Sequence, residues 1–116
     1  MQKEKLRKII AEGENQEAEF KENWPSNTTL SKVICSFANT FGGALIIGVD
    51  DPGKVKGIDQ KDLDELQKKI SEANKAISPI PLLSITTQKI NNQHIICVEV
   101  KRAHDYAYHT FHGAIY

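Results

Sequence analysis

The chain has 116 residues, of which 40% are hydrophobic, and this length supports one hydrophobic core rather than two. Fifteen lysine and arginine residues balance fifteen aspartate and glutamate residues, so the chain lacks the overall basic excess of proteins that coat nucleic acids without specificity. No apolar run approaches the roughly 20 residues of a membrane-spanning helix, and the first residues lack the apolar core of a signal peptide. We therefore expect a single cytoplasmic domain over residues 1–116.

The first predicted elements are a helix, a short strand and a second helix. Apolar residues at helical spacing among charged ones predict an amphipathic helix over residues 3–12, which Gly13 ends. Residues 17–21 then predict a brief strand. Asn27 or Thr28 is expected to cap the second helix, whose apolar face should pack on a sheet.

The middle of the chain carries the clearest strand signal. Residues 44–49 form a continuous apolar run rich in isoleucine, which is typical of a central strand buried on both faces. The two glycines at 42–43 stop the preceding helix. Residues 51–54 have the composition of a turn, and residues 55–58 are predicted to return as a short antiparallel strand.

The second half predicts a helix and a hairpin. Asp59 is expected to cap a helix over residues 60–76, because apolar residues recur there at helical spacing. Residues 82–90 and 94–100 are strand-like and are separated by the turn-forming residues 91–93.

These elements predict an α+β domain in which one mixed sheet of five or six short strands packs with two or three helices. Cys35 and Cys97 lie in apolar stretches and are expected to be buried, reduced thiols. Residues 113–116 have the pattern of an opening strand. We therefore expect the chain to be the N-terminal domain of a longer protein.

Residues 48–54 fit the GxxxxGK spacing of a phosphate-binding loop but lack its chemistry. Val55 stands where a hydroxyl should reach magnesium, and Pro52 removes an amide donor from the cradle. No helix is predicted to follow, so no helix N-terminus would hold a phosphate. The segment is instead predicted to be a hairpin turn.

Three acids and a lysine form the sharpest candidate site. Glu14, Glu19 and Asp50 stand before, within and after predicted strands, so they could converge on a divalent cation such as magnesium or manganese. Lys21 lies on the same strand face as Glu19 and could neutralise phosphate charge. From spacing alone, the favoured interpretation is a set of solvated surface acids with an ion pair to Lys21.

Three histidines and two aromatic residues have weaker signals. His104, His109 and His112 lack the compact spacing of a zinc site, which favours a polar, partly exposed loop. Trp24 and Phe41 are placed where an aromatic ring could stack on a base, although such residues are more often lids on a core.

Lys101 and Arg102 follow the last clear strand as a small basic cluster. Such a cluster could meet a backbone phosphate, and a solvated strand end is an equally good interpretation.

The chain resembles the Schlafen/AlbA-type DNA-binding domain found at the N-terminus of bacterial RecG-helicase-related proteins and transcriptional regulators. The resemblance rests on Glu14-x4-Glu19-Phe20-Lys21, on the FANTFGG sequence at residues 37–43 and on LIIGVDD at residues 45–51, with VKGI at 55–58. It implies an Alba-like fold and a regulatory role in binding nucleic acid, DNA or structured RNA. On this hypothesis Lys21, Lys54, Lys101 and Arg102 contact the phosphate backbone.

The resemblance also implies an alternative function. Related domains of the eukaryotic Schlafen branch are endoribonucleases that act on transfer RNA through three carboxylates. By motif these acids fall on Glu14, Glu19 and Asp50, with Lys21 as the basic companion and magnesium or manganese as the metal. Schlafen enzymes join two such domains, so a homodimer is expected for the full-length protein.

Overall fold

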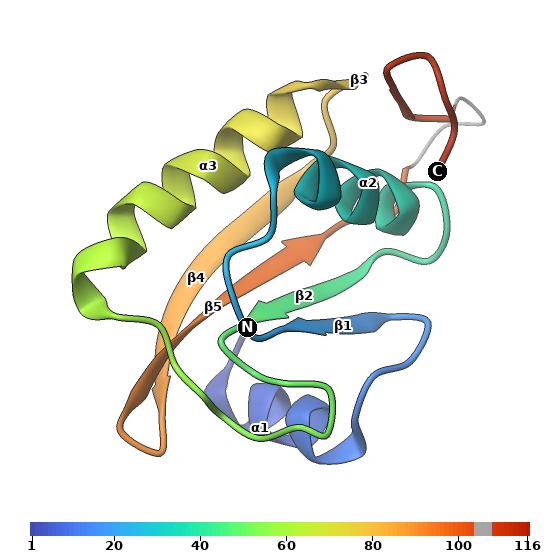
Figure 1. The fold of residues 1–116 in the computed structure, drawn as a ribbon. Coiled ribbons are helices and arrows are strands. Elements are labelled where there is room, and N and C mark those ends of the chain that lie inside the picture. Colours follow the sequence, from blue (N-terminus) through green and yellow to red (C-terminus); the bar gives the residue numbers. More distant parts are fainter. Residues whose placement is uncertain (104–107) are drawn as a thin grey trace.

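A computed structural model describes residues 1–103 and 108–116 of the chain. Helices and strands alternate through most of these residues (Figure 1). The elements are α1 (Lys3–Glu12), β1 (Ala18–Lys21), α2 (Asn27–Ala38), β2 (Gly43–Ile47), the 3-10 helix η1 (Gln60–Asp62), α3 (Leu63–Lys75), β3 (Ile77–Ser78), β4 (Leu83–Ile90), β5 (Gln93–Val100) and β6 (Thr110–Phe111). None of the helices in these residues is both long and apolar enough to cross a bilayer.

The main sheet has four strands in the order β1-β2-β5-β4. β1 runs parallel to β2, whereas β2 with β5 and β5 with β4 are antiparallel pairs. β3 and β6 form a separate two-stranded sheet. The predicted α+β class with a mixed sheet is confirmed, and the described strands divide between two sheets instead of joining one.

Each face of the main sheet is covered by helices, so the domain has an apolar layer on both sides of the sheet (Figure 1). α2 and α3 cover one face and pack on Leu45 and Ile47 of β2, whereas Leu6 of α1 packs on Ile46 from the other side. Because successive side chains of a strand point to opposite faces, the continuous apolar run of β2 is explained by burial on both sides. The predicted central strand is therefore confirmed.

Helix starts differ slightly from the sequence prediction. Ser26, rather than Asn27 or Thr28, caps α2, and its hydroxyl oxygen accepts a hydrogen bond from the Thr29 amide at 3.1 Å. Asp59 makes no side-chain cap, because η1 intervenes and α3 begins only at Leu63. The capping predictions were wrong because several adjacent residues were chemically suitable and only the backbone path selected among them.

The hairpin between β4 and β5 has a two-residue turn. Asn91 and Asn92 both have positive φ, at 50° and 62°, which is the conformation that a type I′ turn requires and that asparagine tolerates. Gln93, predicted as part of the turn, instead pairs with Ile90 as the first residue of β5.

The GxxxxGK segment is a hairpin turn, as predicted. The Asp50 amide donates to the Lys54 carbonyl at 3.0 Å, and Val49 and Val55 form an isolated antiparallel bridge. The predicted return strand over residues 55–58 is reduced to such bridges, the second of which joins Ile58 to His94.

The predicted strand at residues 113–116 is also reduced to a bridge. Ala114 pairs with Phe111 across a short turn, through hydrogen bonds of 2.9 and 3.0 Å in the two directions. The segment thus folds back on β6.

Gly42 should be far less tolerant of a side chain than Gly113. Both have nearly the same positive φ, 77° and 76°, but a Cβ on Gly42 would lie 2.7 Å from the Val100 carbonyl oxygen, whereas one on Gly113 would meet nothing within 4 Å. We expect Gly113→Ala to lower the free energy of unfolding by about 1 kcal/mol through backbone strain alone. Gly42→Ala should cost about 1–3 kcal/mol more, because backbone atoms must move. Urea denaturation of both variants measures the difference, and equal losses would contradict the close approach at Gly42.

Both cysteines should resist thiol reagents in the folded protein. Burial raises the pKa of Cys35, and burial together with the nearby Glu99 carboxylate raises the pKa of Cys97 to about 11. Because the thiolate is the reactive form and a raised pKa depletes it, about one Cys97 in a thousand is ionised at pH 8. Labelling with a chromogenic disulfide at pH 8 should be slow for the native protein and rapid in guanidinium. Rapid labelling of either thiol in the native state would contradict this burial.

Candidate functional site

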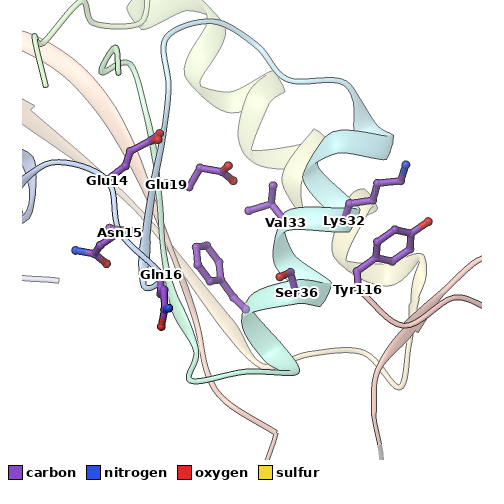
Figure 2. Close-up of a pocket in the computed structure, with 10 residues that line it drawn as sticks. Glu14, Asn15, Gln16, Glu19, Lys32, Val33, Ser36 and Tyr116 are labelled. Carbon is purple, nitrogen blue, oxygen red and sulfur yellow. The ribbon is translucent and has the colours of Figure 1, made fainter. Parts of the chain in front are cut away.

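A pocket of about 410 Å³ lies between the edge strand β1 and helix α2. Figure 2 shows Glu14 and Glu19 on the β1 side of this pocket and Lys32 and Ser36 on the α2 side, with Tyr116 beside Lys32. The lining residues are Glu14, Asn15, Gln16, Ala18, Glu19, Lys32, Val33, Ser36, Phe37 and Tyr116. Two of the predicted acids therefore share one pocket.

Glu14 closes the free edge of the sheet. Its Oε1 accepts a hydrogen bond of 2.7 Å from the backbone amide of Phe20, in the middle of β1. Because β1 has a sheet neighbour on one side only, this amide would otherwise be an unpaired donor at an open edge. The carboxylate of Glu14 thus has a structural role.

Glu19 and Lys21 lie on the same face of β1 and form the ion pair that their spacing predicted. The Nζ of Lys21 is 4.0 Å from Oε1 of Glu19, and both side chains are slightly more than a third exposed. A partly exposed pair at this distance contributes about 0–1 kcal/mol. This pair leaves both groups accessible to solvent and to a ligand.

Asp50 is not brought to the other two acids. The parallel register places Glu19 beside Leu45, and Asp50 comes five residues later, beyond the end of β2. Its Oδ1 accepts a hydrogen bond of 2.7 Å from the Lys54 amide, inside the hairpin turn.

The described residues contain no group of three or more histidine, cysteine, aspartate or glutamate side chains arranged to hold a metal. Glu14 and Glu19 supply two carboxylates, and one of these already accepts a backbone hydrogen bond. These two residues therefore do not make up the three-carboxylate site that the family resemblance implies.

The four predicted phosphate-contacting residues divide between the two ends of the sheet. They are Lys21, Lys54, Lys101 and Arg102. Val100, the last residue of β5, pairs with Gly43, the first residue of β2. Lys101 and Arg102 follow Val100 and therefore lie at this end of the sheet. The first two lie at the other end, where the Gly48 amide bonds to the Lys21 carbonyl and Val49 bridges Val55. The set is two pairs and not one continuous patch.

The guanidinium of Arg102 lies over an exposed aromatic ring. Its guanidinium carbon lies 5.9 Å from the ring centroid of Phe41, whose side chain is 65% exposed. Trp24 is 37% exposed, and the Nζ of Lys69 lies 5.5 Å from its ring. The interpretation as a core lid was wrong for Phe41, because most of its ring is exposed. Nearly two thirds of the Trp24 side chain is covered, which is compatible with a lid over the core.

Backbone contacts fix the position of the Arg102–Phe41 pair. The Ala103 amide donates to the Ala38 carbonyl at 2.9 Å, which ties the chain after β5 to the end of α2. Gly42 closely approaches the Val100 carbonyl, so Phe41 is held beside the residues that follow β5. The pair therefore lies in two short loop segments that backbone contacts hold against the ends of α2 and β5.

Only Glu14 and Glu19 of the residues that line the pocket were predicted, and the others include Lys32, Ser36 and Tyr116. Lys32 and Ser36 are four residues apart and so share one helix face, a spacing visible in the sequence. The Nζ of Lys32 lies 5.3 Å from the Tyr116 ring, a contact between distant segments that no local pattern indicated.

The histidine-rich segment is only partly the exposed loop that was predicted. His109 is 7% exposed, its amide donates to Oδ1 of Asn39 at 2.7 Å, and its Nδ1 contacts the Pro79 carbonyl. His112 is exposed, as predicted, and His104 lies outside the described residues. The prediction was wrong for His109 because Asn39, distant in sequence, satisfies its backbone inside the domain.

Comparison with known proteins identifies the family. The model of the Schlafen, AlbA_2 family matches residues 14–116, and the chain belongs to this family, as the motifs indicated. No curated protein matches the chain.

Two solved structures have the same fold. One is the N-terminal domain of an ATP-dependent DNA helicase RecG-related protein from Nitrosomonas europaea, with a TM-score of 0.65 and 19% identity over 97% of this chain and 82% of that chain. The other is the DIP2311 protein from Corynebacterium diphtheriae, with a TM-score of 0.58 and 23% identity over 86% of this chain. The match spans a quarter of the length of DIP2311. At these identities the likeness shows the fold alone.

Substitutions at Glu14 separate a structural carboxylate from a metal ligand. Glu14→Ala should lower the free energy of unfolding by about 1–2 kcal/mol, because the Phe20 amide loses its acceptor. Glu14→Gln keeps an acceptor oxygen and should lose less than half as much. Thermal unfolding with and without manganese provides the measurement. A melting temperature that manganese raises in the wild type but not in Glu14→Gln would show that the carboxylate binds metal instead.

Proposed function

We propose that this chain is a nucleic-acid-binding domain of a regulatory protein, and that it contacts DNA through the surface formed by Phe41, Lys101 and Arg102. The exposed Arg102–Phe41 pair is the observation that carries the proposal. Membership of the Schlafen, AlbA_2 family and the fold shared with the N-terminal domain of a RecG-related helicase protein support it.

The chemistry of this surface suits a nucleic-acid strand. An exposed aromatic ring offers a face on which any base can stack, and a neighbouring guanidinium adds a cation–π contribution and a charge for phosphate. Lys101, which is exposed and precedes Arg102, supplies a second charge at the same place. Such a surface gives local attraction to phosphate although the whole chain has no net charge.

The second pair of cations, Lys21 and Lys54, would meet the backbone at the other end of the sheet. A strand lying across the domain could touch both ends, and phosphate contacts of this kind position a ligand without reading its bases. Binding is therefore expected to depend on salt and only weakly on sequence.

The alternative function, a metal-dependent endoribonuclease acting on transfer-RNA-like substrates, has less support. It requires Glu14, Glu19 and Asp50 around one cation, and Asp50 is held in a separate turn. The geometry of the described residues favours binding.

Phe41→Ala should weaken binding to single-stranded DNA by about 5- to 150-fold, the range expected for loss of one base stack. Phe41→Tyr is the matched control, because it keeps an aromatic ring at the same position and should bind like the wild type. Fluorescence anisotropy with labelled oligonucleotides measures both. Equal affinities of Phe41→Ala and wild type would remove the proposed surface.

Salt titration of the same complex tests the cations. The double variant Lys101→Ala with Arg102→Ala should reduce the slope of log affinity against log salt by about 1.4 for a single strand, because two phosphate contacts are lost. A wild-type affinity that does not change with salt would argue against phosphate contacts altogether.

A further inference from the structure

The outer edge strand β4 presents a row of unpaired backbone groups. In the antiparallel pair of β4 with β5, the Lys101 amide bonds to the Leu82 carbonyl, which fixes the even-numbered residues of β4 as those bonded to β5. The odd-numbered residues Leu83, Ile85, Thr87 and Lys89 therefore direct their amides and carbonyls away from the sheet. Within residues 1–103 and 108–116 these groups have no backbone partner.

This edge carries few of the features that usually prevent pairing with another chain. β4 is eight residues long, pairs with β5 in unbroken register without a bulge, contains no proline and carries one charged residue, Lys89. The other edge strand, β1, has four residues and is closed by the Glu14 side chain. Long edges that carry little charge and no bulge are templates for strand addition.

Helix α3 lies beside this edge and carries a stripe of alternating charge. Gln67, Lys68, Ser71, Glu72 and Lys75 line a groove of about 320 Å³ together with Ile85 of β4. Asp64, one turn before Lys68, extends the stripe toward the start of the helix. The charged residues of the stripe therefore alternate in sign along the helix, in the order Asp64, Lys68, Glu72 and Lys75.

When two α3 helices lie antiparallel, the charges of this stripe on one copy face opposite charges on the other. In an antiparallel arrangement centred near residue 70, Asp64 faces Lys75 of the partner subunit, and Lys68 faces the partner subunit's Glu72. A two-fold axis relates identical patches in this way, because residue i contacts residue j while j contacts i. Charge complementarity therefore selects a second copy of this chain as the occupant of the edge.

We propose that two copies of the chain associate through antiparallel pairing of their β4 strands, which joins the two four-stranded sheets into one continuous sheet. The register that uses every outward residue places Leu83 opposite the partner's Lys89 and Ile85 opposite the partner's Thr87. Each of these pairs exchanges two hydrogen bonds. The proposal names the surface of a dimer and does not depend on nucleic-acid binding.

Sedimentation equilibrium from micromolar to high micromolar concentration, combined with amide hydrogen exchange, tests the pairing. The dimer should form as concentration rises, and the amides of Ile85, Thr87 and Lys89 should become protected only then. The amides of Thr86 and Gln88, bonded to β5 in either state, are the internal control. A chain that stays monomeric, or outward amides whose exchange is independent of concentration, would overturn the proposal.

Two sets of variants locate the interface. Thr87→Pro removes an outward donor and should weaken dimerisation at least tenfold, whereas Thr87→Val keeps the amide and should dimerise like the wild type. Circular dichroism checks the fold of both.

Lys68→Glu and Glu72→Lys each place like charges across the two-fold axis and should weaken the dimer about three- to tenfold. The double variant with both charges reversed should restore it. Single reversals without effect, or a Thr87→Pro variant that dimerises normally, would show that another surface is used.

Discussion

Burial of the central strands on both faces is the constraint on which the rest of the structure depends. β2 and β5 carry isoleucine, valine and leucine toward α2 and α3 on one side and toward α1 on the other. Removing this apolar surface from water is the main favourable term in folding, at about 25 cal/mol per Å². Because both faces are covered, the edges and ends of the sheet are its accessible parts.

The close approach of glycines at residues 42–43 links this core to the candidate interface. Gly42 packs on the Val100 carbonyl, and a Cβ at Gly43 would lie 2.5 Å from the Phe37 ring. This contact brings the end of α2, the start of β2 and the end of β5 together. Phe41 and Arg102, which are far apart in sequence, become neighbours as a result.

The two edge strands of the sheet differ in whether their outward backbone groups have a hydrogen-bond partner. At β1, Glu14 accepts the Phe20 hydrogen bond, so an acid that the family motif suggests for catalysis completes the backbone hydrogen bonding of a strand. At β4, the outward amides and carbonyls have no such partner among the described residues. A short, closed edge beside a pocket and a long, open edge on the far side give the domain two distinct surfaces.

The sequence by itself determined the longer elements and the family, because each depends on a pattern within a short segment. These patterns are the apolar period of α1 and α3, the unbroken apolar run of β2 and the FANTFGG motif. The short elements η1, β3 and β6 were not predicted. Cap positions were off by one or more residues, since neighbouring polar residues could serve equally well. Tertiary structure alone decided which side chains meet. Strand register separates Glu19 from Asp50, and a long-range backbone hydrogen bond from Ala103 to Ala38 brings Arg102 beside Phe41. Spacing along the chain encodes neither arrangement.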